Sequence, residues 1–288
     1  MTVVEAMERL WPVELTPRTK YLRTIWAEMA RTHSHLLWLG LLADAFGFES
    51  MFLQFWRIRE RVLDLIEMTC GHRVIPSVSV VGGVRRDINP EQKKVILEAL
   101  PVIRKESEDL VKVVTNDYTV KARTIGVGVL TKELAIALGC VGPVLRASGV
   151  REDARLTKYH AYGDLSSFEP IVETTGDCYA RTLVRARELF QSIDMQVEAL
   201  NKLPEGEIAA KVRGNPPANE AVMRTEAPRG ELFYYAKGNG TRNLERLKIR
   251  TPTYANLPSL LVMLPGCELA DVPVIVLSID PCICCMER

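Results

Sequence analysis

The sequence has no apolar run long enough to cross a lipid bilayer. Its longest apolar stretch, Leu36–Ala43, has about eight residues, whereas a membrane-spanning helix needs about 20, so we expect that the chain does not cross a membrane by itself. A strong charge is also absent: the formal net charge is +1, and the aromatic residues are not interleaved with basic runs. We therefore expect no nucleic-acid partner. No internal repeat and no low-complexity run occur, and this excludes repeat arrays and disordered tracts.

Cysteine is scarce over most of the chain and concentrated at its end. Of the seven cysteines, three lie within the last nine residues, Asp280–Arg288. An odd count without a signal peptide is typical of a reducing compartment, where clustered thiols serve metals or catalysis more often than disulfides. The other four are interpreted as buried hydrophobic side chains: Cys70, Cys140, Cys178 and Cys267.

Within this tail, Cys282 and Cys285 stand three apart behind a proline, which is a spacing that metal ligands use. A terminal segment normally frays, so thiols placed there are useful only if the fold or a bound metal fixes them. The apolar run Val272–Leu277 is expected to be buried and to anchor the tail. Two other interpretations stay open: the cysteines are small hydrophobic residues, or they form half of a structural zinc site.

Helical periodicity dominates the rest of the chain. With 288 residues, 47% of them hydrophobic, the protein can bury a sizeable core. Capping or breaking residues such as Asn89, Gly139 and Pro204 bound the periodic segments. The expected helices cover Thr2 to Leu10, Leu22 to Gly40, Phe52 to Ile66, Asn89 to Val114, Thr131 to Leu138 and Asp177 to Leu203.

The periodicity changes beyond the polar linker Arg213–Glu220. Glu231–Lys237 and Leu247–Arg250, on either side of a glycine-rich turn, are typical of an antiparallel hairpin. The sequence therefore predicts a mainly α protein, a helical bundle with a small β-hairpin appendage, whose metal and cofactor sites lie on side chains that face inward between helices. We expect residues 1–288 to form a single domain.

Two adjacent glycines, Gly82 and Gly83, are followed by the charged segment Arg85–Asp87. Paired glycines allow two backbone segments to approach closely. The other interpretation is a turn with a solvated charge cluster.

Six motifs occur in order along the chain: His33–Leu37, Gly82–Asp87, Gly142-Pro143 with Arg146–Gly149, Gly176–Tyr179, Glu226–Leu232, and Asp280-Pro281-Cys282 with Cys285. Together they resemble the large subunit of nickel-iron hydrogenases, in particular the membrane-bound, energy-converting kind. The resemblance extends to a relative of these enzymes, the 49-kilodalton quinone-site subunit of respiratory complex I, and it covers nearly the whole chain. It implies a hydrogenase large-subunit-like fold.

The resemblance implies roles for individual residues. Cys282 would be a terminal nickel ligand, and Cys285 would bridge nickel and iron, an iron that carries diatomic ligands. Arg229 would place its guanidinium above the metals, unless it forms a surface ion pair with Glu226 or Glu231. Asp44 would hydrogen-bond this arginine, with Asp280 as a weaker candidate. Cys284 is interpreted as a small filler.

The two histidines of the first motif, His33 and His35, stand two apart on a helix. They therefore point to different faces and cannot chelate one ion together. A core or interface position is the simplest interpretation for both. The resemblance to the quinone-site subunit implies a cofactor-binding or proton-handling role for His35.

The sequence departs from the hydrogenase pattern in one respect. The family supplies two further metal cysteines from an Arg-x-Cys-Gly-x-Cys motif near the N-terminus, and this motif is absent here. Three explanations compete: the chain is a fragment that lacks its N-terminal portion, a separate polypeptide supplies the first pair, or the protein is a metal-free descendant. We favour the first, because a degenerate site is not expected to keep Cys282, Cys285 and Arg229 together. An end at Arg288 is typical of a matured subunit or of one encoded without its extension.

The resemblance thus implies an oxidoreductase, the large subunit of an energy-converting nickel-iron hydrogenase that evolves or oxidises dihydrogen. Its partners would be a small subunit with an iron-sulfur cluster and ion-translocating subunits of a membrane arm. The chain would lie peripherally at the cytoplasmic face of the cell membrane. The alternatives are a quinone-contacting subunit of a complex I-like NADH-quinone oxidoreductase, which needs no nickel, and a structural zinc protein.

Overall fold

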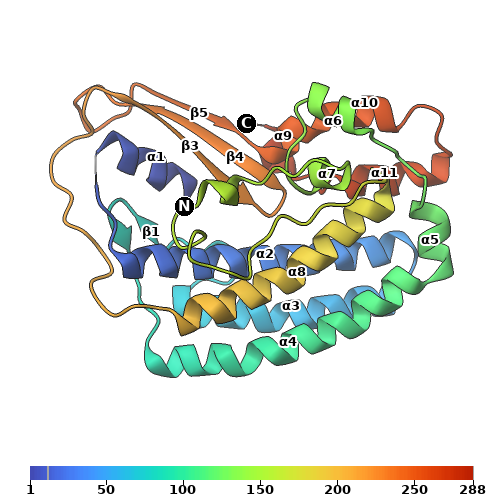
Figure 1. Cartoon of the computed structure of the whole chain (residues 1–288), viewed down its shortest axis with the longest axis horizontal. Helices are drawn as coiled ribbons and strands as arrows, with labels where there is room; N and C mark the ends of the chain where they lie inside the picture. The colour runs from blue at the N-terminus through green and yellow to red at the C-terminus, as the bar shows by residue number, and fades with distance from the viewer. Residues whose placement is uncertain (12, 288) are drawn as a thin grey trace.

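Four long helices form the body of the molecule in the computed structural model, which describes residues 1–11 and 13–287. They are α2 (Pro17–Ala45), α3 (Glu49–Cys70), α4 (Pro90–Asn116) and α8 (Cys178–Asn201), and they run alongside one another in Figure 1. The helix α2 packs against α3 and α8, and α4 packs against the same two helices. The predicted helical bundle is therefore confirmed. The predicted end at Arg288 lies outside the described residues.

Local capping explains where these helices begin. Asn89 accepts a hydrogen bond from the backbone N–H of Gln92 at 2.8 Å, and the Gln92 side chain accepts one from the backbone N–H of Asn89 at 3.0 Å. This is a capping box, and Pro90 occupies the first helical position. At the start of α2 the Thr16 hydroxyl accepts a hydrogen bond from the Thr19 N–H at 3.2 Å, so that helix begins earlier than predicted.

A three-stranded antiparallel sheet lies above the bundle, with strand order β3-β4-β5. The predicted hairpin corresponds to β4 (Gly230–Lys237) and β5 (Arg246–Arg250), whereas the sequence pattern does not predict β3 (Glu220–Ala227). Exposed residues alternate with buried ones along the first part of β3, as in a strand with one face on a core. The sheet is therefore larger than a hairpin.

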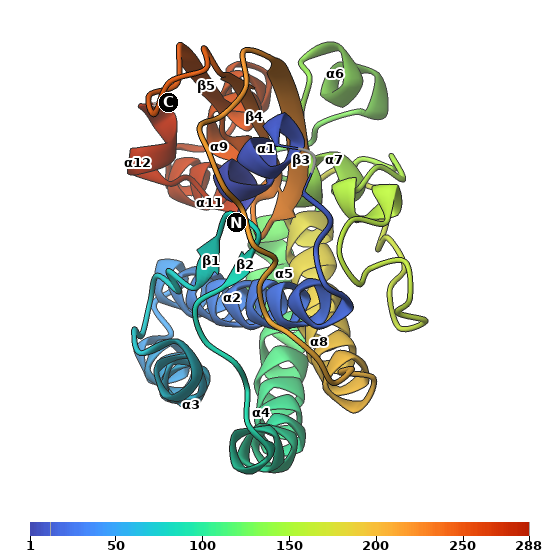
Figure 2. The ribbon, with the colours of Figure 1, turned by 90° about the vertical axis from the view of Figure 1, so that its left-hand side faces the viewer.

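The helix α1 (Thr2–Leu10) covers one face of this sheet, as Figure 2 shows. Its buried Ala6 and Leu10 pack against Met223 of β3 and Ala236 of β4. The segment from 2 to 10 thus forms the predicted helix, and burial against the sheet stabilises it.

A second sheet has two short strands, β1 (Ser79–Val80) and β2 (Gly83–Val84). The paired glycines here contact another backbone segment: the Ala210 N–H donates to the Gly82 carbonyl at 2.8 Å. A Cβ atom on Gly83 would lie 2.4 Å from the Ile208 carbonyl oxygen. The close approach is therefore confirmed. The charged residues that follow are also exposed, as the alternative interpretation predicts, and Asp87 pairs with Arg18 at 2.8 Å.

Short elements connect the bundle to the sheet and surround a second core that includes Leu130, Val144 and Ile275. No helix in the described part of the chain is long and apolar enough to cross a membrane. These elements are α5 (Tyr118–Thr124), α6 (Lys132–Ala137), α7 (Gly142–Ala147), η1 (Ala154–Thr157), α9 (Pro252–Asn256), η2 (Leu257–Ser259), α10 (Leu260–Met263), η3 (Leu269–Asp271), α11 (Val272–Ser278) and α12 (Ile283–Met286).

The turn between β3 and β4 is held against the start of α7 by a contact between two glycines. Gly142 has a φ of 67°, and a Cβ atom added to it would lie 2.2 Å from the Gly230 Cα and 2.7 Å from the Arg229 carbonyl oxygen. Such distances are shorter than any side chain tolerates without backbone movement. Glycine at position 142 is therefore needed for its backbone conformation and for its lack of volume.

We predict that Gly142→Ala destabilises the protein more than Gly139→Ala. Both glycines have a φ of 67°, but a Cβ atom on Gly139 meets nothing within 4 Å. The left-handed conformation costs about 1–2 kcal/mol in each variant, and overpacking adds about 1–3 kcal/mol in Gly142→Ala alone. The free energies of unfolding of the two purified variants measure the difference. Equal values would show that the Gly142–Gly230 contact is unimportant.

Candidate functional site

The C-terminal tail is anchored by α11, as the sequence predicts. Val274 and Ile275 of this helix are fully buried. The indole N–H of Trp38, from α2, donates to the Leu277 carbonyl at 2.8 Å. This hydrogen bond ties the end of α11 to the bundle, so the residues that follow begin from a fixed point.

The thiols of Cys282 and Cys285 lie on one helical turn at the end of the tail. Cys282 caps α12, and its carbonyl accepts a hydrogen bond from the Cys285 N–H at 3.0 Å. Both residues are half-buried, whereas Cys284 is exposed. Burial, together with the hydrogen bond to Cys282, raises the pKa of the Cys285 thiol to about 11. The side chains of Cys282 and Cys285 interact directly with each other, a placement that suits one shared metal ion. Cys284 is not part of this pair.

Of the other cysteines, Cys70, Cys140 and Cys178 are buried and Cys267 is half-buried. Three of the four therefore match the expectation of buried hydrophobic side chains.

Arg229 lies on the turn between β3 and β4 and contacts the start of the tail. Its Nε donates to the Asp280 carbonyl at 3.0 Å, and its Nη2 lies 3.0 Å from the Asp280 Oδ1. Asp280 is buried and has a φ of 55°. The alternative ion pairs of Arg229 with Glu226 or Glu231 are not present, because Glu226 pairs with Arg146 and Glu231 pairs with two other arginines.

The prediction that Asp44 forms a hydrogen bond with Arg229 is wrong. Asp44 lies near the end of α2 with its side chain exposed to solvent, and Asp280 takes the place expected for it. The physical reason is chain continuity: Asp280 directly precedes the Pro281-Cys282 turn that Arg229 reaches, whereas α2 presents Asp44 on its outer face. Asp280, which the sequence indicated as the weaker of the two candidates, is therefore the partner of Arg229.

The described residues do not make a complete nickel-iron centre. They contain no group of three or more His, Cys, Asp or Glu side chains placed to hold a metal ion. Cys282 and Cys285 suit nickel and iron in kind, because soft thiolates bind both metals. In number they are half of the four cysteines that the resemblance implies, so two further ligands would have to come from outside this group of residues.

His35 is fully buried between α2 and α8, where its Nε2 lies 3.1 Å from the Glu188 Oε2. Burial lowers the pKa of His35 and outweighs the opposite effect of Glu188. His33 is half-buried on a different face, and burial with the nearby charges of Arg59 and Arg229 lowers its pKa to about 4. The expectation that the two histidines face different surroundings is confirmed.

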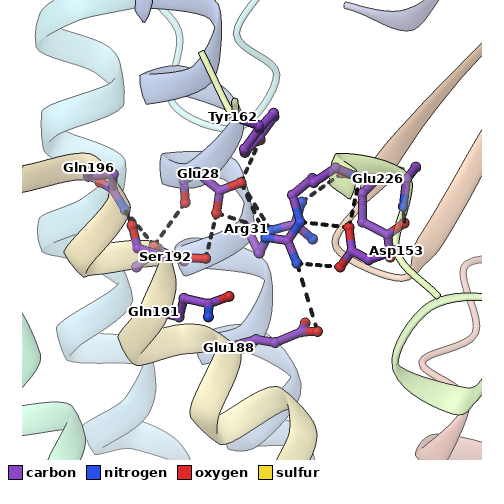
Figure 3. Close-up of polar contacts among 12 residues, drawn as sticks. Glu28, Arg31, Asp153, Tyr162, Glu188, Gln191, Ser192, Gln196 and Glu226 are labelled. Carbon is purple, nitrogen blue, oxygen red and sulfur yellow. Dashed lines mark hydrogen bonds and ion pairs between the residues drawn. The ribbon is translucent and has the colours of Figure 1, made fainter. Parts of the chain in front are cut away.

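Glu188 belongs to a cluster of buried charged residues, shown in Figure 3. Arg146 lies at its centre: its guanidinium is 2.7 Å from the Glu188 Oε1, 2.8 Å from the Glu226 Oε1 and 3.1 Å from the Asp153 Oδ2. Arg155 contacts Asp153 at 2.7 Å. The side chains of these five residues are at most 1% exposed.

The cluster continues into α2 through Glu28. The Tyr162 hydroxyl donates to the Glu28 Oε1 at 2.6 Å, and the Ser192 hydroxyl donates to its Oε2 at 2.7 Å. Arg31, on the same helix, contacts Glu28 at 3.1 Å and donates to the Glu226 carbonyl at 2.7 Å. The cluster thereby links α2, α7, α8, β3 and the segment around η1.

The carboxyl groups of the cluster differ in their pKa values. Burial raises the pKa of Glu188, but the charge of Arg146 and the hydrogen bond from His35 outweigh it and hold this pKa well below the ordinary value. For Glu226, burial and the negative charge of Asp153 raise the pKa to about 7, and Arg146 opposes them only in part. Glu226 is thus the carboxyl group whose protonation is easiest.

Sequence reasoning missed most of this cluster, although a signal for it is present. Glu28, Arg31 and His35 follow one another at spacings of three and four within an apolar periodic segment, so they share the buried face of α2. Charged residues at such positions need buried partners of opposite charge. Arg146 and Glu226 lie inside motifs of the hydrogenase resemblance, but those motifs carry no expectation that the two residues pair.

The sequence is similar to known proteins over its whole length. The family model described as the 49 kDa subunit of respiratory-chain NADH dehydrogenase matches residues 45–215 and 211–288. The chain is 38% identical to membrane-bound hydrogenase subunit alpha of Pyrococcus furiosus, over 100% of this chain and 71% of that protein. It is also 38% identical to the carbon monoxide-induced hydrogenase of Rhodospirillum rubrum, over 100% of this chain and 80% of that protein.

A third relative is named as a subunit of an NADH-quinone oxidoreductase and not as a hydrogenase. An NADH-quinone oxidoreductase subunit of Clostridium beijerinckii is 34% identical over 96% of this chain and 76% of its own length. The names of these relatives describe oxidoreductases, and two of them are named as subunits of larger assemblies. The relation to both branches that the motifs indicate is confirmed, and the chain belongs to the family of the 49 kDa subunit of respiratory-chain NADH dehydrogenase.

Proposed function

We propose that the chain is the large subunit of an energy-converting hydrogenase and that Cys282 and Cys285 provide two thiolate ligands of its nickel-iron centre. The arrangement at the tail supports this proposal: two half-buried thiols share one turn, and Arg229 contacts the residue two positions before the first of them. When bound, such a centre supplies the reversible heterolytic cleavage of dihydrogen. The second pair of thiolates comes from outside the described cysteines.

In this proposal the chain works as part of an assembly at the cytoplasmic face of the cell membrane. The relative from Pyrococcus furiosus is named as a subunit of a membrane-bound hydrogenase, and this supports a peripheral place in a membrane complex. A small subunit with an iron-sulfur cluster passes the electrons, and membrane-arm subunits couple their transfer to ion movement.

A second candidate function is that of a quinone-contacting subunit without nickel. One observation favours it: a cavity of about 220 Å³ lies between α2 and the sheet, lined largely by apolar side chains such as Trp26, Val78, Pro228 and Leu232. Small-molecule sites are concave and mostly apolar. The relation to a subunit of the NADH-quinone oxidoreductases also supports this alternative.

Metal content distinguishes the two functions. We predict that the purified native complex contains nickel and that Cys282→Ser or Cys285→Ser abolishes its retention, because a hydroxyl is a poor replacement for a soft thiolate. Elemental analysis of the purified complexes gives the nickel content. The matched control is Cys284→Ser, which changes an exposed thiol on the same turn and is expected to retain nickel.

A native complex without nickel would contradict the hydrogenase proposal and leave the quinone-contacting function. Equal loss of nickel in all three serine variants would contradict the assignment of Cys282 and Cys285 as the ligands. Zinc in place of nickel would favour a structural metal site instead.

Arg229→Lys tests the proposed role of the guanidinium. Lysine cannot contact both the carbonyl and the carboxylate of Asp280 in a planar geometry. We predict that dihydrogen turnover falls by about 10²-fold or more, as for the loss of a preorganised electrostatic group, while nickel content is kept. Arg224→Lys, which changes a surface partner of Glu231, serves as the control. Unchanged turnover in Arg229→Lys would exclude this role.

A further inference from the structure

The buried cluster, part of which is labelled in Figure 3, contains more carboxylates than guanidinium groups that pair with them. Four carboxyl groups face three guanidinium groups within it, and all are buried. With every group in its ordinary ionisation, and with His35 neutral, these seven groups carry one excess negative charge. The buried guanidinium of Arg185 also acts on Glu188, but it forms no ion pair with any of the four carboxyl groups in the described part of the chain. An uncompensated charge is costly in a buried environment. The carboxyl groups belong to Glu28, Asp153, Glu188 and Glu226, and the guanidinium groups to Arg31, Arg146 and Arg155.

The four carboxyl groups are not equally compensated. Glu28 accepts two hydroxyl hydrogen bonds besides its contact with Arg31, Asp153 is bound by two arginines, and Glu188 is bound by Arg146 and His35. Glu226 has one ion pair, with Arg146 at 2.8 Å, and accepts one backbone hydrogen bond, from the Ala154 N–H at 3.0 Å. The excess charge is therefore least well compensated at Glu226.

Glu226 also has a route to the surface. It is the cross-strand partner of Glu231 in the antiparallel pairing of β3 and β4, so the two side chains lie on the same face of the sheet. Both line a cavity of about 10 Å³, together with Asp153 and the start of α7. That volume is about the space that one water molecule requires, and the acidic side chains in the lining offer it hydrogen-bond partners. Glu231, on the outer side, pairs with surface Arg224 and Arg250.

We propose that Glu226 is a proton-binding site that takes up one proton for the whole cluster and exchanges it with solvent through the cavity shared with Glu231. The proton comes from water and adds to a carboxylate oxygen of Glu226. Each such oxygen has two lone pairs, so one remains free beside the hydrogen bonds described above. Only O–H bonds form and break, and no electron is transferred. The proposal does not depend on the nickel-iron centre.

The groups around Glu226 agree with this assignment. Burial has the largest effect on its pKa and raises it, and the charge of Asp153 raises it further, whereas Arg146 and Arg155 lower it, so that the pKa is about 7. The backbone of Glu226 is satisfied separately. Its N–H donates to the Tyr159 hydroxyl at 3.0 Å, and its carbonyl accepts a hydrogen bond from Arg31.

Two other charged groups face the same region from neighbouring elements. Glu5 of α1, the helix packed on β3, is paired with His160. Arg185 of α8 lies over the Trp38 ring at 4.5 Å, and its charge acts on Asp280 and Glu188, but it forms no ion pair with the four carboxylates among the described residues. Neither group compensates the charge at Glu226 directly.

Protonation of Glu226 changes the electrostatic environment of the other residues in the cluster. Arg146 connects Glu226 to Glu188, and Glu188 in turn contacts His35. The low polarity of the interior strengthens electrostatic interactions along such a chain of contacts. Protonation of Glu226 therefore changes the electrostatic potential at His35.

Infrared difference spectroscopy of the purified native complex tests the proposal. Spectra recorded on either side of neutral pH are expected to contain the carbonyl stretch of a carboxyl group that becomes protonated as the pH falls. This band is expected to be lost in Glu226→Gln and kept in the matched control Glu220→Gln, which changes an exposed carboxylate of the same strand outside the cavity. Persistence of the band in Glu226→Gln would overturn the proposal, whatever the nickel content of the complex.

Asp153→Asn provides an independent test if Glu226→Gln does not fold. Removal of the negative neighbour lowers the pKa of Glu226, because Asp153 raises it in the native protein. The midpoint of the infrared band is therefore expected to move to lower pH. A midpoint that does not move, or that moves to higher pH, would contradict the assignment.

The pH dependence of stability gives the third measurement. The ordinary pKa of a glutamate, 4.5, applies to the unfolded chain, and the folded value is about 7. Between these values the native state holds a proton that the unfolded state has released, so stability falls as the pH rises through this window. Glu226→Gln is expected to lose this part of the pH dependence, as unfolding at about pH 5 and about pH 8 would measure. An unchanged dependence would contradict the proposal.

Discussion

Arg146 joins three segments that are far apart in the chain and so holds the fold together at one buried point. Its guanidinium binds Glu188 of α8, Glu226 of β3 and Asp153 before η1. Removal of one partner from such a buried group costs about 3–5 kcal/mol, because an uncompensated charge remains. The cost of an unpaired buried charge is avoided only when Arg146 contacts all three partners. The three ion pairs therefore fix the end of β3 relative to the helices.

The short helix α7, which carries Arg146, holds the turn between β3 and β4 at two points. Arg146, near the end of α7, binds Glu226 before the turn, and Gly142, at its start, contacts Gly230 after it. Arg229 lies between these two points and reaches Asp280 in the C-terminal tail. The tail is fixed independently by α11 and by the hydrogen bond from Trp38. The positions of the two thiols therefore follow from contacts made by residues far away in the sequence.

The family combines this scaffold with more than one function, since the relatives include proteins named as hydrogenases and as NADH-quinone oxidoreductase subunits. The buried cluster is separate from the cysteine pair, and its proton balance does not require a metal. Both dihydrogen evolution and quinone reduction consume protons, so a proton-binding site at Glu226 is compatible with either branch. In this chain the thiols, and not the cluster, distinguish the two proposed functions.

Local sequence patterns are sufficient to predict the long helices, the β4–β5 hairpin and the burial of the apolar run that anchors the tail, because these depend on periodicity and on capping residues such as Asn89. The spacing of the cysteine pair is a local pattern as well, whereas Arg229 is indicated by the family resemblance. The assignment of β3 as a strand, by contrast, requires its pairing with β4. The contact of Arg229 with Asp280 rather than Asp44, and the gathering of carboxylates around Arg146, likewise arise only in the folded chain. Such pairings depend on three-dimensional proximity, which local sequence patterns do not encode.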